Sequence, residues 1–274
     1  MKHVVCFSGG KDSTALVLWA KENLPEFTTV FCDTGWEHPI TYAYVEEINQ
    51  TVLGGGGLVY LHSETYKDMM ACWLDHQMFS NNQARFCTED MKIAPLHRYF
   101  ESLEDEVTAY QGVRADESDK RRSASPREWV DGGGGYWMER PLLRWSAEQV
   151  FDYLKHHDVA PNPLYLLGMS RVGCWPCIHA NHRDIKAYLG ATPEIKKRLI
   201  EAENKMRERT GKVRTFFRHG FIPDRFCSIQ TEHRGRKIGI PTAEDVFRYI
   251  ESVDENQLPL LPARSCMSVY NLCE

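Results

Sequence analysis

Apolar residues near the N-terminus follow two alternating periods. His3 to Phe7 is a short β-rich run, and after a six-residue loop Thr14 to Leu24 repeats apolar residues at helical spacing. Phe27 to Cys32 and Leu58 to His62 are further β-rich runs, with the helical pattern Thr41 to Val52 between them. The pattern predicts strand, loop, helix, strand, helix, strand.

The alternation continues along the chain. Strands that alternate with helices imply βαβ units and a mainly parallel sheet flanked by helices, so we expect an α/β core at residues 1–190. A helical, basic C-terminal extension and tail follow at residues 191–274. The later segments that carry these predictions are a helix at Thr88 to Leu103 containing Pro95, a strand at Val107 to Gln111, a helix capped by Ser146 and Gln149, a helix after Thr192 and Pro193, and a last helix at Thr242 to Ser252.

The loop between the first strand and the first helix is the stretch "SGGKDS", Ser8 to Ser13. A glycine loop at this place points backbone N–H groups and the positive end of the helix dipole at one spot, which favours an anion. The stretch lacks the spacing of the Walker loop and of the dinucleotide G-x-G-x-x-G loop. It therefore predicts a phosphate site of another type.

The second strand ends in "FCDTGWEHP". A carboxylate just past the carboxyl end of a strand lies at the crevice where open α/β sheets bind ligands. Asp33 is therefore a candidate site residue, although an Asp-Thr-Gly sequence taken alone is more often only a turn.

The composition is that of a globular protein. The 274 residues are 42% hydrophobic and 26% charged, and no stretch approaches the roughly 18 apolar residues of a membrane span. We expect a cytoplasmic protein without a membrane partner. Nine cysteines without a secretory signal favour thiol, metal or catalytic uses over a disulfide framework.

Charge is distributed unevenly. The net charge is −5, but Lys196 to Lys237 holds thirteen Lys and Arg against five Asp and Glu, a net +8. Two interpretations stay open for this stretch: a solvated helix face, or a surface that binds nucleic acid or another polyanion.

Several motifs follow in order: "SGGKDS", "CDTGW", "RFCTEDMKIAPL" from Arg85, "GVRADES" from Gly112, "RPLLRWSAEQVFDYL" from Arg140 and "NPLYLLGMSRVGCWPC" from Asn162. Together they resemble the phosphoadenosine phosphosulfate (PAPS) reductase-like family of N-type ATP pyrophosphatases (PP-loop). The resemblance is strongest to its phage and prophage members and to the DndC-type sulfur-transfer ATPases of DNA phosphorothioation, and it covers Val4 to about Arg183. It implies an adenine nucleotide alpha hydrolase-like, Rossmann-like fold.

The resemblance also implies roles for individual residues. Arg114 would contact the nucleotide phosphates and Arg85 would assist, whereas we interpret Lys92 as ordinary surface charge. Asp33 and Gly35 would belong to the nucleotide site. The phosphate loop would hold the β and γ phosphates of ATP, with Ser8, Gly9, Gly10 and Ser13 cradling them, Lys11 adding charge and Asp12 helping to hold Mg²⁺.

Cys174 and Cys177 form C-x-x-C, and Cys87 stands where the reductases carry a cysteine pair for a 4Fe-4S cluster. We predict these three thiols as cluster ligands and Cys227 as the fourth, with a three-cysteine cluster and one open iron as the alternative. Zn²⁺ is a further alternative, because His179 and His182 follow closely. The remaining cysteines are expected as small buried residues at Cys6, Cys32 and Cys72, while Cys266 and Cys273 in the tail have no assigned role.

The function that the resemblance favours is ATP-dependent sulfur transfer: cleavage of ATP to AMP and pyrophosphate adenylates an acceptor, possibly a nucleic acid, for thiolation. A sulfur donor such as a cysteine desulfurase would be the partner. The main alternative is a PAPS or adenosine phosphosulfate (APS) reductase, but reductases usually lack the intact loop and carry a C-terminal "ECGLH" motif, whereas this chain ends in "SVYNLCE". An ATP sulfurylase-like subunit and a metal-stapled nucleic-acid-binding protein are further alternatives. The sequence identifies neither the acceptor nor the oligomeric state.

Overall fold

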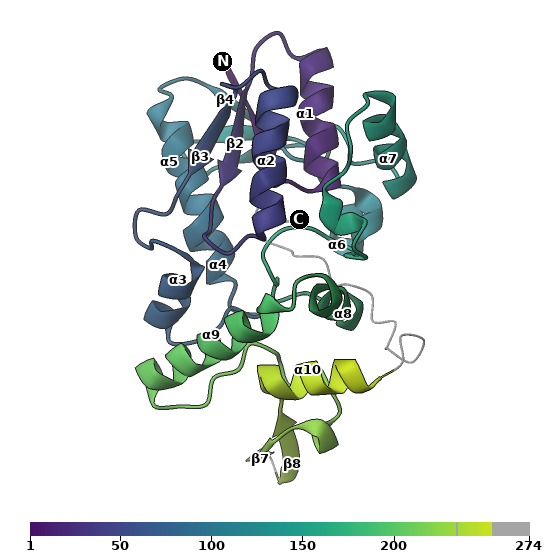
Figure 1. Ribbon diagram of the computed structural model, residues 1–274. Helices are drawn as coiled ribbons and strands as arrows, with labels where there is room; N and C mark the ends of the chain where they lie inside the picture. Colours follow the sequence, from purple (N-terminus) through teal and green to yellow (C-terminus); the bar gives the residue numbers. More distant parts are fainter. Residues whose placement is uncertain (234, 254–274) are drawn as a thin grey trace.

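The computed structural model describes residues 1–233 and 235–253 and centres on a six-stranded sheet (Figure 1). Five strands are parallel, and β5 at one edge runs antiparallel to β6. This is the mainly parallel, Rossmann-like arrangement that the sequence predicted. In spatial order the strands are β3 (Leu58–Leu61), β2 (Thr28–Cys32), β1 (Lys2–Phe7), β4 (Val107–Tyr110), β6 (Tyr136–Glu139) and β5 (Arg127–Val130).

Helices cover both faces of this sheet because side chains of neighbouring strand residues point to opposite faces. Val5 and Phe31 pack under α1 (Lys11–Asn23), α2 (Pro39–Thr51) and α7 (Ala147–His156). Val4 and Val30 pack on the other face with α5 (Ala94–Ser102). Both faces of the central strands are therefore buried, as in other sheets built from βαβ units.

The predicted helix Thr88 to Leu103 is present but not uniform. It consists of α4 (Phe86–Thr88), a π-helical turn at Glu89–Ile93 and α5. Pro95 lies in the first turn of α5, where its missing N–H and its ring disfavour an unbroken α-helical ladder. The capping box of Ser146 and Gln149 at the start of α7 is confirmed.

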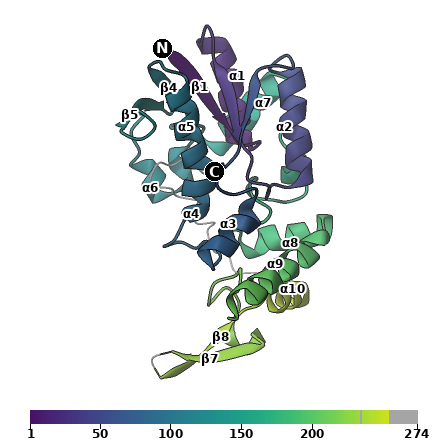
Figure 2. The same ribbon diagram turned by 90° about the vertical axis from the view of Figure 1, so that its left-hand side faces the viewer.

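A second layer of helices lies beyond the carboxyl ends of the strands (Figure 1). It contains α3 (Met69–His76), α8 (His182–Ala191), α9 (Glu194–Thr210) and α10 (Ala243–Ser252). The C-terminal region is thus mostly helical, as predicted, but it also carries the hairpin β7 (Ile229–His233) and β8 (Arg236–Ile240), which projects away from the sheet in Figure 2. Short helical turns complete the fold at Ala115–Glu117, Asp119–Arg122 (α6), Pro163–Tyr165 and Asp224–Phe226.

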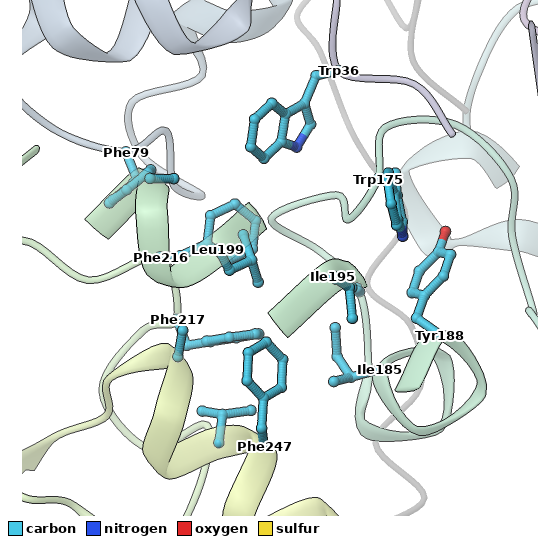
Figure 3. Packing of buried hydrophobic residues seen from close by; sticks show 14 of the residues in the cluster. Trp36, Phe79, Trp175, Ile185, Tyr188, Ile195, Leu199, Phe216, Phe217 and Phe247 are labelled. Atoms are coloured by element: carbon cyan, nitrogen blue, oxygen red, sulfur yellow. The ribbon is translucent and has the colours of Figure 1, made fainter. Parts of the chain in front are cut away.

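One apolar cluster joins the C-terminal helices to loops of the sheet domain (Figure 3). Trp36, which follows β2, and Trp175, between the two cysteines of the C-x-x-C motif, lie in this cluster with Leu199 of α9 and Phe247 of α10. The boundary that we predict at residue 190 stays a prediction.

Within the described part of the chain, every helix is too short or too polar to cross a bilayer.

Candidate functional site

The phosphate loop lies where β1 ends and α1 begins. Gly10 is the N-cap of α1 and has no side chain to cap the helix. The N–H groups in the first turn of α1 therefore lack the Ser, Thr or Asp oxygen that usually accepts from them. The hydroxyl groups of Ser13 and Thr14 instead donate to the Gly10 carbonyl at 3.0 and 2.9 Å. Ser8 N–H donates to Ser13 Oγ at 3.2 Å, which closes the loop. The positive end of α1 is therefore shaped for an anion.

Glycine is required at two positions of this loop and its neighbour. Gly9 has a φ of +77°, and a Cβ there would lie 2.9 Å from Cγ2 of Thr41 on α2. Gly112, just past β4, approaches the Asp12 carbonyl so closely that a Cβ would lie 2.9 Å from it. The phosphate loop therefore packs against α2, and the segment that begins at Gly112 packs against the phosphate loop.

Asp12 is buried between two cations. Its carboxylate pairs with Lys11 Nζ at 2.5 Å and with Arg114 Nε, and both Asp12 and Arg114 are almost completely buried. Arg114 also pairs with Asp116. Burial opposes the charged guanidinium, but Asp12, Glu117 and Asp116 outweigh it and raise the pKa of Arg114. Arg114 thus lies at the loop, as its position after β4 predicted, with its guanidinium engaged by carboxylates.

Two side chains from "NPLYLLGM" brace the phosphate loop. Asn162 is fully buried and donates from Nδ2 to the Gly9 carbonyl at 3.0 Å. The Tyr165 hydroxyl accepts the Lys11 N–H at 3.1 Å. The sequence does not reveal either contact, because each joins residues more than 150 positions apart.

The second strand loop holds Asp33 in a hydrogen-bond network. Asp33 Oδ1 accepts the Gly35 N–H at 2.9 Å and the Tyr42 hydroxyl at 2.6 Å. Glu37, which is buried, accepts the Thr34 hydroxyl at 2.6 Å. Burial, Glu37 and Asp33 together raise the pKa of Tyr42, so this hydroxyl stays a donor. Gly35 has a φ of +65° and lies against Asp68, where a Cβ would be 2.8 Å from the Asp68 Cβ.

A small crevice, partly open to solvent, lies at the carboxyl ends of β1, β2 and β4. Its place is the one expected for ligands of an open α/β sheet. It extends from Ser8 and Ser13 of the phosphate loop to Gly173, the residue before Cys174. The phosphate loop and the residue that precedes the C-x-x-C motif therefore border one crevice.

Lys92 also lines this crevice, from the π-helical turn, and is half-buried. Our interpretation of Lys92 as ordinary surface charge is therefore wrong. The irregular turn directs the residue inward, which a plain helical pattern does not reveal. Arg85 lies at the start of α4, where its Nη2 donates to Thr88 Oγ1 at 3.3 Å.

The loop after β2 connects the crevice to the cysteines. Glu37 and Cys174 form an isolated antiparallel β-bridge, and the Trp175 N–H donates to the Trp36 carbonyl at 2.7 Å. Trp36 Nε1 donates to the Pro176 carbonyl at 3.3 Å. The C-x-x-C turn is therefore fixed directly to the Asp33 loop.

Cys174, Cys177 and Cys87 are close enough to influence one another. Burial raises the pKa of the Cys174 thiol well above its usual value; Lys92 opposes this shift, while Glu37, Cys177 and Cys87 add to it. Cys87 lies on α4 and packs with Cys174 against the same apolar cluster. The three thiols come from two segments, and Cys87 and Cys177 both lie near Cys174.

Cys227 lies elsewhere in the fold. It is buried against Gly239 of β8, where a Cβ on the glycine would be 2.7 Å from its Sγ, and burial, Asp245 and Asp224 raise its pKa. These contacts do not join it to the other three cysteines. His182, named in the zinc alternative, is buried with its Nε2 2.6 Å from the Phe221 carbonyl. Cys266 and Cys273 lie outside the described residues.

Arg198 from α9 reaches the site from the basic stretch. Its guanidinium carbon lies 3.7 Å from the ring centroid of Trp36 and 5.1 Å from that of Trp175, and Nη2 donates to the Gly35 carbonyl at 3.3 Å. Burial lowers the pKa of Arg198, against the opposing effects of Tyr42 and other groups. Sequence reasoning treated Arg198 only as part of the basic stretch, and the two tryptophans give no signal of this contact.

Comparisons with known proteins agree with this geometry. The family model described as phosphoadenosine phosphosulfate reductase domain matches residues 2–180. An uncharacterized 37.8 kDa protein of Escherichia phage 186 is 31% identical in an alignment of 256 positions, which covers 73% of this chain and 74% of the phage protein. An adenosine 5'-phosphosulfate reductase of Deinococcus radiodurans is 31% identical over 157 residues, 55% of this chain and 56% of the reductase.

A solved structure supports the fold. The crystal structure of phosphoadenylyl-sulfate (PAPS) reductase from Candida auris, as a phosphate complex, has a TM-score of 0.51 and 19% identity, covering 64% of this chain and 82% of that chain. The match confirms the sheet and its flanking helices, which carry the phosphate loop and the crevice. By its motifs, its fold and the match over residues 2–180, the chain belongs to the phosphoadenosine phosphosulfate reductase domain family.

Proposed function

We propose that the chain is an ATP-dependent sulfur transfer enzyme, a PP-loop ATP pyrophosphatase that adenylates an acceptor and releases pyrophosphate. The observation that carries this proposal is the complete glycine loop at the start of α1. Gly10 leaves the helix N-terminus without a side-chain cap, and Gly9 lets the backbone turn tightly there. Such a site suits the two terminal phosphates of a nucleoside triphosphate.

The charged groups at this loop suit attack on the α-phosphate. Lys11 and Arg114 bring positive charge to the loop, where it would stabilise the charge that develops as pyrophosphate leaves. Asp12 is the carboxylate that would hold Mg²⁺, an ion that takes oxygen ligands from carboxylates and phosphates. Asp33 and Gly35 would face the nucleotide from the next strand, and Arg85 would add charge from α4.

The cysteines fit an iron–sulfur cluster in their chemistry. Cys87 and Cys174 pack against the apolar cluster, and Cys177 and Lys92 lie near Cys174. A four-iron cluster held by these three cysteines would supply an iron able to bind sulfur. Because Cys227 packs against β8, we favour the three-cysteine set over the four-cysteine set.

The basic stretch offers a surface for a nucleic-acid acceptor. Phosphate contacts by Lys and Arg supply most sequence-independent affinity for nucleic acid. The exposed cations of α9 and the following segments are Lys197, Lys205, Arg207, Arg209, Lys212, Arg214, Arg218, Arg225, Arg236 and Lys237. A sulfur donor such as a cysteine desulfurase would complete the reaction.

Salt dependence tests this surface. We expect the affinity for DNA or tRNA to fall steeply between low and high salt. Arg214→Ala should reduce the slope of log affinity against log salt concentration by about one. Lys2→Ala, on the distant end of the sheet, is the control. If the protein does not bind DNA or tRNA even at low salt, the proposal of a nucleic-acid acceptor is wrong.

A PAPS or APS reductase is the second candidate, favoured by the names of the relatives and by the thiols beside the crevice. The experiment that decides is a comparison of two reactions on anaerobically prepared protein. With ATP, Mg²⁺, a sulfide source and a mixture of DNA and tRNA, we expect AMP and pyrophosphate. With APS or PAPS and a thiol reductant, we expect no sulfite. Sulfite formation without AMP formation from ATP would establish the reductase instead.

A further inference from the structure

We propose a second metal site, for a borderline divalent ion such as Zn²⁺, formed by Cys72, His76 and Asp90. None of its three ligands is a thiol assigned to the cluster, although Cys87 lies nearby on α4, and the site does not depend on the proposed function. One ligand atom from each residue lies within 4.8 Å of the other two. Thiolate, imidazole and carboxylate are the ligand types of protein zinc sites.

The helical geometry brings the three side chains together. Cys72 and His76 are four residues apart on α3 and therefore share one face of the helix. Asp90 comes from the π-helical turn Glu89–Ile93, packed opposite that face. The Asp90 carboxylate lies 2.8 Å from His76 Nε2 and 3.8 Å from Cys72 Sγ.

The site is held by contacts that fix its ligands before an ion binds. Asp68 caps α3 by accepting the Ala71 N–H at 2.7 Å, which fixes the first turn of the helix. The His76 ring stacks on Phe86 with centroids 3.8 Å apart and an interplanar angle of 17°. Such outer contacts set the orientation of a ligand ring and preorganise a metal site.

Exposure supplies an entry path and an open position. Cys72 is buried, whereas the side chains of His76 and Asp90 are 35% and 31% exposed. A Zn²⁺ ion would therefore meet the thiol at the base and solvent at the outer side. Three protein ligands with a fourth position left to water is a common arrangement of zinc that binds exogenous ligands.

A metal site explains the contacts among these three side chains better than core packing alone does. The ion pair of His76 and Asp90 is partly exposed and therefore contributes little to stability. That pair does not explain why the buried thiol of Cys72 also contacts the Asp90 carboxylate. Sequence reasoning expected Cys72 as a small buried residue, and its burial is confirmed. A cysteine that only fills the core does not need His76 and Asp90 as neighbours.

Cobalt(II) is the probe that tests the site, because thiolate coordination gives a charge-transfer band and tetrahedral geometry gives intense visible absorption. The full chain carries Cys87→Ser, Cys174→Ser and Cys177→Ser, so that the three thiols assigned to the cluster cannot bind the probe. We expect one equivalent of Co²⁺ to bind with both spectral features, and Zn²⁺ to displace it. Cys72→Ser should abolish the charge-transfer band, and His76→Gln should weaken binding at least about tenfold.

The control is Cys227→Ser, which removes another buried thiol and should leave the spectrum unchanged. Far-ultraviolet circular dichroism establishes that each variant is folded; if Cys72→Ser does not fold, His76→Gln on the exposed side decides. Absence of the cobalt spectrum, or a spectrum unaffected by the folded variant, would overturn the proposal.

Discussion

At the scale of single residues, Asp12 depends on its cations. It is 1% exposed and pairs with Lys11 and Arg114. A buried charge that loses its partner costs far more than the pair contributes, because the remaining charge is desolvated without compensation. The same contacts hold the three charged side chains at the start of α1.

Arg114→Ala should therefore lower the free energy of unfolding by about 3–5 kcal/mol, because it leaves Asp12 short of one partner. Asp12→Asn combined with Arg114→Gln should recover part of that loss. Asp116→Asn, at the half-exposed partner of Arg114, should cost less than about 1 kcal/mol. Urea unfolding of the variants measures this, and equal costs for Arg114→Ala and Asp116→Asn would contradict the account.

Glu203 gives the molecule a pH dependence. Burial raises its pKa to about 7, although the Ala243 and Phe216 N–H groups and Arg207 act in the opposite direction. In the unfolded chain the carboxyl releases its proton near pH 4.5. The folded state therefore binds one more proton between these values, and stability falls as pH rises.

We predict that the free energy of unfolding falls by about 1.4 kcal/mol per pH unit from this group between pH 5 and 7, and then levels off. Glu203→Gln should flatten this slope. Glu201→Gln, at an exposed position on α9, is the matched control and should keep the slope of the parent protein. An unchanged slope in Glu203→Gln would show that another group is responsible.

Residue-level prediction succeeded where a contact is local and failed where it spans the chain. Ser13 and Asp12 could be placed at the start of α1 because they follow a strand and begin a helix. Asn162 and Arg198 could not, because their partners Gly9 and Trp36 are distant in sequence. Local pattern carries no information on such pairs.

At the scale of elements, the turn from β1 to α1 requires Gly9. An alanine there would combine a positive φ with a Cβ 2.9 Å from Thr41 Cγ2. We expect Gly9→Ala to lower the free energy of unfolding by about 1–3 kcal/mol and to weaken ATP binding about tenfold.

Gly56→Ala is the control for that variant, since no atom lies within 4 Å of the added Cβ. It should change the free energy of unfolding by less than about 0.5 kcal/mol. Thermal unfolding and ATP titration of both proteins make the comparison. Tight ATP binding by a folded Gly9→Ala protein would show that the loop does not need this backbone conformation.

Long periodic segments were predicted well, and short polar strands were not. The strands β1 to β4 and the helices α1, α2, α7, α9 and α10 lie where the apolar pattern placed them. The four-residue strands β5 and β6 flank a tract of glycines, and β7 and β8 are rich in polar residues. Tyr136 and Met138 of β6 are buried, so the short length of β5 and β6 hides their pattern, whereas β7 and β8 lack one because of their polar composition.

At the scale of the whole molecule, the C-terminal helices pack against the loop that follows β2. Trp73 of α3 packs on Phe216 with centroids 5.8 Å apart, and Arg198 covers Trp36. The cluster in Figure 3 thus ties the loop after β2 to α9 and α10. The sequence could indicate a basic extension, but it could not show that the extension reaches back to the loop that holds Asp33.

The measurement that tests the central claim most directly is calorimetric titration with nucleotides and pyrophosphate in the presence of Mg²⁺. A loop built for the terminal phosphates should bind ATP more tightly than AMP or APS, and pyrophosphate should compete with ATP. Ser13→Ala, which removes the hydroxyl that closes the loop, should weaken ATP and pyrophosphate together. AMP or APS binding at least as tight as ATP, with no competition by pyrophosphate, would contradict the account and favour a reductase.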